Sequence, residues 1–170
     1  MYDFSEITLN CLKEAGWSHD YRYDPTQLFA FFADIKIAIP QKAREFIEHY
    51  GGLKIMHPHA KVDNYWEELV FDCQLSWIKS NSKNWSRGVE TTVEASLFPI
   101  GTCYNGLVFV FMAESGRVYV DSGDHCFAGD SGEQFIERIC TRFNWNTDDL
   151  DQIEGMEARL LAEEAGKPAI

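Results

Sequence analysis

The chain has 170 residues, 45% of them hydrophobic and 25% charged, which fits one globular domain with a sizeable core. It holds 27 acidic and 15 basic residues, so its formal net charge is −12. This balance argues against direct binding of duplex nucleic acid, which needs clustered lysines and arginines, and it permits a basic protein partner. No apolar run approaches the ~20 residues that span a bilayer, and the start of the chain lacks the pattern of a signal peptide, so we expect neither a membrane span nor export.

The first predicted helix covers roughly residues 4–15. Asp3 is the expected N-cap, with an acidic residue three positions later to complete a capping box. Gly16 is the expected stop, and Trp17 directly after it is expected to fold back onto the apolar stripe of the helix. We therefore interpret Trp17 as a core anchor rather than a ligand contact.

Two more helices are predicted before residue 51. The second begins at Asp24-Pro25, with Asp at the N-cap and Pro at the first helical position, and its apolar spacing continues to Pro40. The third covers roughly residues 40–50. The residues spaced for the buried faces are Leu28, Phe29, Phe32, Ile35 and Ile39 in the second helix, and Ala43, Phe46, Ile47 and Tyr50 in the third.

A glycine pair, Gly51-Gly52, follows the third helix. Glycine adopts left-handed backbone angles without a Cβ clash, so it is the usual residue just past a helix C-terminus. Residues 53–55 then alternate apolar and polar, as a half-buried strand does. We expect Gly51 to hold a left-handed backbone, so that Gly51→Val would damage folding through a forbidden angle.

The middle of the chain is predicted to be mostly sheet. Residues 68–74 read as a strand, Phe98–Gly101 as a turn, and the unbroken apolar run Leu107–Met112 as a central strand. Glu114–Gly116 is a hairpin signal before another strand. Residues 75–88 give no clear pattern and form a locally basic, aromatic stretch in an acidic protein.

Two helices are predicted near the C-terminus. The first is capped by Asp130, with Glu133 in the capping-box position, and carries the stripe Phe135, Ile136, Ile139 and Cys140. The second covers 147–165 within an acidic segment. We place the folded domain at residues 1–145 and the acidic helix at 146–170, either docked on the domain or extended from it.

The sequence contains no nucleotide-binding, metalloprotease or hydrolase motif, and we assign no catalytic, cofactor or metal residue. His57, His59, His125 and Cys126 could be imagined as a zinc site, but solvated loop histidines and a buried thiol are the better interpretation. His125 and Cys126 are adjacent, so in a strand they point to opposite faces and cannot easily form a catalytic pair. The five cysteines are widely spaced and are expected to be reduced, buried thiols.

Several pieces of the chain, in order, resemble the SUKH-3 immunity protein family of the SMI1/KNR4 (SUKH) superfamily. The most specific piece is 43–53, which is similar to the helix-to-strand motif of the superfamily. The other pieces are Leu12–Trp17, Tyr21–Asp24, Phe71-Asp72, Phe98–Gly101, Ser115–Tyr119 and Phe127–Ser131. The residues that we regard as fold markers are Gly16, Trp17, Gly51, Gly52, Gly101 and Gly116.

The resemblance implies an α+β fold with a single twisted, mostly antiparallel sheet flanked by helices. It also implies a cytoplasmic bacterial protein that binds and neutralises a cognate polymorphic toxin, often a nuclease, without catalysis or a cofactor. The toxin would be the partner, with no direct contact to nucleic acid or membrane. The oligomeric state stays open, since an exposed sheet edge could pair with a second copy.

Two functional hypotheses follow. In the first, an acidic surface covers the basic substrate-binding face of a toxin, with Trp77, Trp85, Asp121, Asp124 and Asp130 as candidate contacts. Taken singly, each Asp is better explained by turn or cap chemistry and each Trp by core packing. In the second, the chain is a regulatory or scaffold module that recruits a partner through the acidic segment 146–170.

Overall fold

The computed structural model describes residues 2–59, 62–82, 96–121 and 125–142. Within these ranges the helices are α1 (Glu6–Glu14), α2 (Thr26–Asp34), α3 (Gln41–Tyr50), α4 (Cys73–Ser82) and α6 (Gly132–Cys140). The strands are β1 (Lys54–Pro58), β2 (Trp66–Val70), β3 (Leu97–Cys103), β4 (Val108–Ala113), β5 (Val118–Asp121) and β6 (His125–Gly129). None of the described helices is long and apolar enough to cross a membrane.

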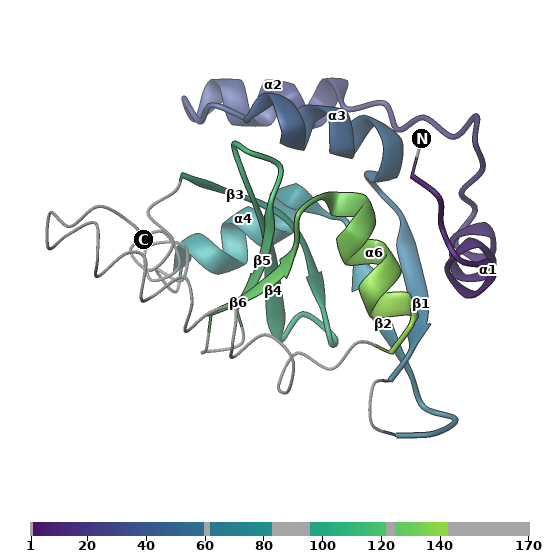
Figure 1. The fold of residues 1–170 in the computed structure, drawn as a ribbon. Coiled ribbons are helices and arrows are strands. Elements are labelled where there is room, and N and C mark those ends of the chain that lie inside the picture. Colours follow the sequence, from purple (N-terminus) through teal and green to yellow (C-terminus); the bar gives the residue numbers. More distant parts are fainter. Residues whose placement is uncertain (1, 60–61, 83–95, 122–124, 143–170) are drawn as a thin grey trace, which may run out of the picture.

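The six strands form one antiparallel sheet in which each strand pairs with the next along the chain. A flat sheet of six strands would be about 24 Å wide, yet α6 contacts both β1 and β6, the first and last strands. The sheet therefore curls around α6, which crosses it in light green in Figure 1, with α2 and α3 at the upper end. The predicted α+β fold with one antiparallel sheet and flanking helices is confirmed.

The main core lies between the helices and one face of the sheet. The predicted stripes of α3 and α6 are buried there, as is the alternation of Val110 and Met112 on β4. The opposite face of the sheet holds a second cluster, made of Leu97, Phe109, Phe111, Ala113, Tyr119 and Phe127 from β3 to β6. The unbroken apolar run at 107–112 thus corresponds to a strand buried on both faces, as predicted.

The α3–β1 junction is more tightly packed than the sequence suggested. Gly51 has φ −55°, so the predicted left-handed backbone at this position is wrong; Gly52, with φ +74°, is the left-handed residue. Gly51 is needed for a different reason, because a Cβ there would lie 2.5 Å from the Ile47 carbonyl oxygen and 2.7 Å from the Tyr23 ring. The Tyr21 hydroxyl donates to the Gly51 carbonyl over 2.7 Å, which fixes the N-terminal segment against the junction.

The predicted helix boundaries at the N-terminus need two corrections. The N-cap of α1 is Ser5 rather than Asp3, because the Ser5 hydroxyl accepts the Thr8 amide over 3.3 Å. The second helix ends at Asp34, five residues before the predicted end at Ile39, because Lys36 turns into the left-handed region with φ 57°. The amides of Lys36 and Ile37 then donate to carbonyls of the last turn, so the helix ends without the glycine that usually marks such a stop.

The prediction for the middle of the chain was partly wrong. The strand predicted at 68–74 ends at Val70, because the Asp72 carboxylate accepts the Leu75 amide over 2.9 Å and so begins α4. The predicted turn Phe98–Gly101 lies inside β3, whose pairing shifts by a bulge between Pro99 and Gly101. The pairing of β2 with β3 is short, and next to it side chains of α4 donate to backbone carbonyls of β3. Cys73 Sγ donates to the Ile100 carbonyl, and Ser76 Oγ donates to the Gly101 carbonyl.

The predicted cap of α6 is displaced by one residue. Ser131, not Asp130, is the N-cap, and its hydroxyl accepts the Gln134 amide over 3.2 Å. Gln134 in turn accepts the Asp130 amide over 2.6 Å, so Gln134 takes the place that was predicted for Glu133. The hairpin at Glu114–Gly116 is confirmed. The predicted helix at 147–165 lies outside the described residues.

Candidate functional site

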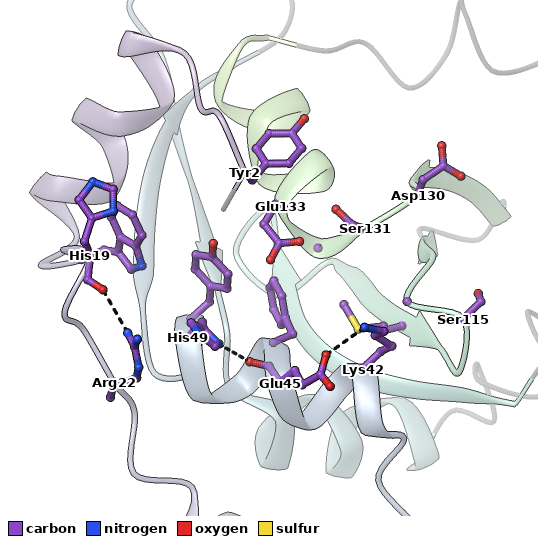
Figure 2. Close-up of a pocket in the computed structure, with 16 residues that line it drawn as sticks. Tyr2, His19, Arg22, Lys42, Glu45, His49, Ser115, Asp130, Ser131 and Glu133 are labelled. Atoms are coloured by element: carbon purple, nitrogen blue, oxygen red, sulfur yellow. Dashed lines mark hydrogen bonds and ion pairs between the residues drawn. The ribbon is translucent and has the colours of Figure 1, made fainter.

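A groove of about 690 Å³ lies between α3 and α6. The N-terminal segment closes one of its sides and the β4–β5 hairpin reaches the other (Figure 2). Its lining residues are Tyr2, Trp17, His19, Arg22, Lys42, Glu45, Phe46, His49, Tyr50, Met112, Ser115, Gly116, Asp130, Ser131, Gly132 and Glu133. The groove is thus assembled from five separate parts of the chain.

The floor of the groove is aromatic. Phe46 and Tyr50 are four residues apart on α3, so their side chains lie on one helix face, with ring centroids 5.0 Å apart. Trp17 stacks on Tyr50 with centroids 6.2 Å apart and planes inclined by 12°. Gly132 lets α6 approach this floor, because a Cβ there would lie 2.2 Å from the Phe46 ring. These contacts give the groove a packed, preformed base.

One end of the groove is basic, as the left side of Figure 2 shows with His19, Arg22 and His49. Arg22 Nη1 donates to the carbonyls of His19, over 3.2 Å, and Tyr21, over 2.6 Å. His49 Nδ1 lies 2.7 Å from the Glu45 carbonyl oxygen, which can only accept, so this nitrogen carries the proton. Backbone carbonyls therefore hold one nitrogen of the guanidinium, and among the described residues no side chain binds its other N–H groups.

The other end carries three carboxylates from different elements. Glu45 on α3 pairs with Lys42 at 3.0 Å, and Asp130 pairs with Arg117 at 3.4 Å; both pairs are exposed. Glu133, in the first turn of α6, points toward α3 in Figure 2. Hydrogen bonds from Gln41 and Lys42 lower the pKa of Glu45. The Tyr50 pKa is raised, first by burial and then by the nearby Glu133 charge.

The structure places the predicted contact residues in different environments. Asp130 lines the groove. Asp121 is 2% exposed within β5, a strand whose four residues are all buried. Trp77 is half-buried on α4, and its ring packs edge-on against Phe32 with ring centroids 6.0 Å apart, which is a core-packing contact. Trp85 and Asp124 lie outside the described residues.

Three groove residues were given other roles by the sequence. Trp17 was interpreted as a core anchor, and it does pack edge-on to Phe4 at 6.2 Å, but it also lines the groove. Glu45 was not among the residues predicted for the buried face of the third helix, and Glu133 was assigned to a capping box. No local spacing connects residues 17, 45 and 133, because only the packing of α3 against α6 brings them together.

His57 and His59, two of the residues considered for a zinc site, do not line the groove. His57 is 1% exposed on β1; burial lowers its pKa to about 4, and its Nδ1 donates to the Pro58 carbonyl over 3.2 Å. His59 Nδ1 accepts the Val62 amide, which leaves Nε2 to face Glu67 at 3.7 Å. Within the described residues, no three His, Cys, Asp or Glu side chains are arranged to hold a metal ion.

The described cysteines form no disulfide bond, and all but the half-buried Cys126 are buried. Burial raises the pKa of the Cys73 and Cys103 thiols. Since the thiolate is the reactive form, these two positions are unfavourable for nucleophilic chemistry. The groove itself contains no cysteine. Its side chains are suited to recognition through stacking, ion pairs and hydrogen bonds.

A family model described as SUKH-3 immunity protein matches residues 4–142 of this chain. Every helix and strand that the structure describes lies within the matched range. The groove also lies within it, apart from Tyr2. In the other two comparisons, no curated protein and no solved structure matches the chain.

Proposed function

The chain belongs to the SUKH-3 immunity protein family, and from this we propose that it binds and neutralises a cognate bacterial toxin through the groove between α3 and α6. The match over residues 4–142 is the observation that carries the proposal. The groove supports it, since a concave surface with an aromatic floor and charged rim suits protein recognition. In such a family the protein acts by occupying its partner, without chemistry of its own.

We further propose that the toxin is basic and acts on nucleic acid. The net charge of −12 supports this, because an enzyme that binds phosphates presents a basic surface. At the groove, the negative charges that would face the basic toxin are those of Glu45, Asp130 and Glu133. Complementary charge would speed association and make it sensitive to salt. The encounter would take place in the cytoplasm, where such a toxin would find its substrate.

The proposal is tested by co-purification of the tagged full-length protein from its native cells. The expected result is a stoichiometric toxin domain whose toxicity in a test strain is suppressed when this chain is co-expressed. Capture that yields no toxic partner contradicts the proposed function. Association with the captured toxin that is equally fast at low and high salt contradicts the electrostatic part alone.

The acidic segment 146–170 provides a further arm of the same experiment. It holds seven acids and two basic residues, and so carries −5 of the net charge. If the toxin is bound through the groove, deleting 146–170 leaves most of the affinity and slows association. Loss of all partner recruitment, with the remaining domain still folded, would instead favour the regulatory or scaffold function.

A further inference from the structure

We propose that the groove recognises a short polypeptide segment of opposite polarity to its own, with a guanidinium at the Glu45–Glu133 end and a carboxylate at the Arg22 end. This inference rests on the proposed function, and it specifies the part of the toxin that the groove accepts. A cavity of about 690 Å³ suits a few side chains of an inserted segment rather than a folded element.

The aromatic floor is the first argument. The faces of Trp and Tyr rings attract cations, and arginine does this best because its planar guanidinium also stacks. The molecule uses the same pairing elsewhere: the Arg44 guanidinium lies 4.6 Å from the Phe29 ring centre, and that of Arg138 lies 5.6 Å from the Phe127 ring centre. Phe46 and Tyr50 are each 5% exposed and lie on the same helix as Glu45, so a guanidinium held by Glu45 and Glu133 at the edge of this floor would be partly desolvated and held more strongly.

The charge pattern of the rim is the second argument. In the part of the chain that the structure describes, no cation lies within ion-pair distance of Glu133. Glu45 is paired with Lys42, but both side chains are about half exposed, at 48% and 56%. Exposed pairs of this kind contribute little, so an incoming guanidinium can replace Lys42 at little cost. A bidentate contact to a carboxylate would then fix its orientation.

The opposite end gives the segment its direction. Arg22 uses one of its nitrogens on two backbone carbonyls, which orients the guanidinium before a partner arrives. Its remaining donors, with His19 beside it, suit a carboxylate. Because the two ends differ in sign, a segment inserted in the reverse direction would meet like charges at both ends.

The direct test uses acetyl-arginine amide as a probe, with acetyl-citrulline amide as its neutral isostere, followed by NMR on the full chain. We expect saturable shifts of the backbone amides of Glu45 and Glu133 with the arginine probe only. Glu133→Gln should weaken the probe about tenfold. Glu6→Gln is the matched control, because Glu6 is also in the first turn of a helix but does not line the groove. Equal shifts with citrulline, or equal affinity in the Glu133 variant, would overturn the inference.

The toxin obtained by co-purification gives a second arm. Glu133→Gln and Arg22→Gln should each weaken toxin binding, while Glu6→Gln should not. A toxin that binds both groove variants as tightly as wild type overturns the groove inference and leaves the proposed function standing. Specific binding of the arginine probe, with no toxin found, overturns the proposed function and leaves the cation chemistry of the groove standing.

Discussion

Helix α3 takes part in two regions with opposite character. At its C-terminal end, the junction with β1 has no space for a side chain: a Cβ at Gly51 would lie 2.5 Å from the Ile47 carbonyl oxygen and 2.7 Å from the Tyr23 ring. Along its side, the groove is open and lined by exposed charges such as Lys42 and Glu45. One helix therefore contributes to the packed core at its C-terminal end and to an open binding surface along its side. Changes at the junction should therefore alter stability, and changes in the groove should alter binding.

The largest expected effect is at the junction. Gly51→Ala should lower the free energy of unfolding by about 3 kcal/mol or more, because its Cβ overlaps backbone and ring atoms that cannot move easily. Urea denaturation measures this. The control is Gly16→Ala, where φ is +88° but no atom lies within 4 Å, so only backbone strain of about 1 kcal/mol is expected. Equal losses in both variants would show that crowding at Gly51 is not the cause.

The second effect compares a buried histidine with a groove histidine. His57 has a folded pKa of about 4 against 6.5 unfolded, so its neutral form is favoured by folding. Its contribution is present above pH 6.5 and is lost as the pH falls toward 4. Between pH 7 and pH 5 it should cost about 2 kcal/mol. Urea denaturation at both pH values should show this loss in wild type and in the exposed control His49→Gln, but not in His57→Gln.

Glu67 acts in the opposite direction. Burial raises its pKa, so its folded state prefers the protonated form and its contribution to stability improves as the pH falls toward its unfolded pKa. In the His57→Gln variant, the free energy of unfolding should therefore stay constant or rise slightly as the pH falls from 7 to 5. A wild-type-like loss in that variant would assign the acid sensitivity to another group.

A third, smaller effect is at the start of α6, where the groove meets the core. Ser131→Ala should destabilise the protein by about 1 kcal/mol, because its hydroxyl caps the Gln134 amide. Asp130→Ala should cost less, since the ion pair that its exposed side chain makes with Arg117 contributes little. Thermal denaturation of the two variants ranks them. The reverse order would restore Asp130 as the cap.

The smallest effect on stability is expected in the groove. Glu133→Gln should change the free energy of unfolding by less than about 0.5 kcal/mol, because this half-buried side chain lies on the groove rim outside the core and glutamine keeps its size. The same variant should still weaken partner binding, so its effect on binding would be separate from any effect on stability. Chemical denaturation of Glu133→Gln and of the control Glu6→Gln measures the two changes in the free energy of unfolding for comparison. A loss as large as that of Ser131→Ala would mean that the groove rim is structural.

Sequence patterns predicted the elements whose information is local. The periodic stripes of α3 and α6, the apolar run of β4 and the hairpin at Glu114–Gly116 were all confirmed. Errors came where a side chain competed with the pattern. Asp72 ended a strand by capping α4, and Lys36 ended a helix without glycine. In both places a single hydrogen-bonding or backbone choice outweighed the apolar spacing.

By itself, the sequence determined the α+β class, the family and the need for glycine at the α3–β1 junction, because each depends on the order and spacing of residues along the chain. Only the tertiary structure decided why Gly51 is required, since the crowding ring belongs to Tyr23, far upstream. Likewise, only the curling of the sheet around α6 places Glu133 opposite Glu45 and Trp17. A groove made from distant segments leaves no periodic trace, because its geometry is a consequence of packing.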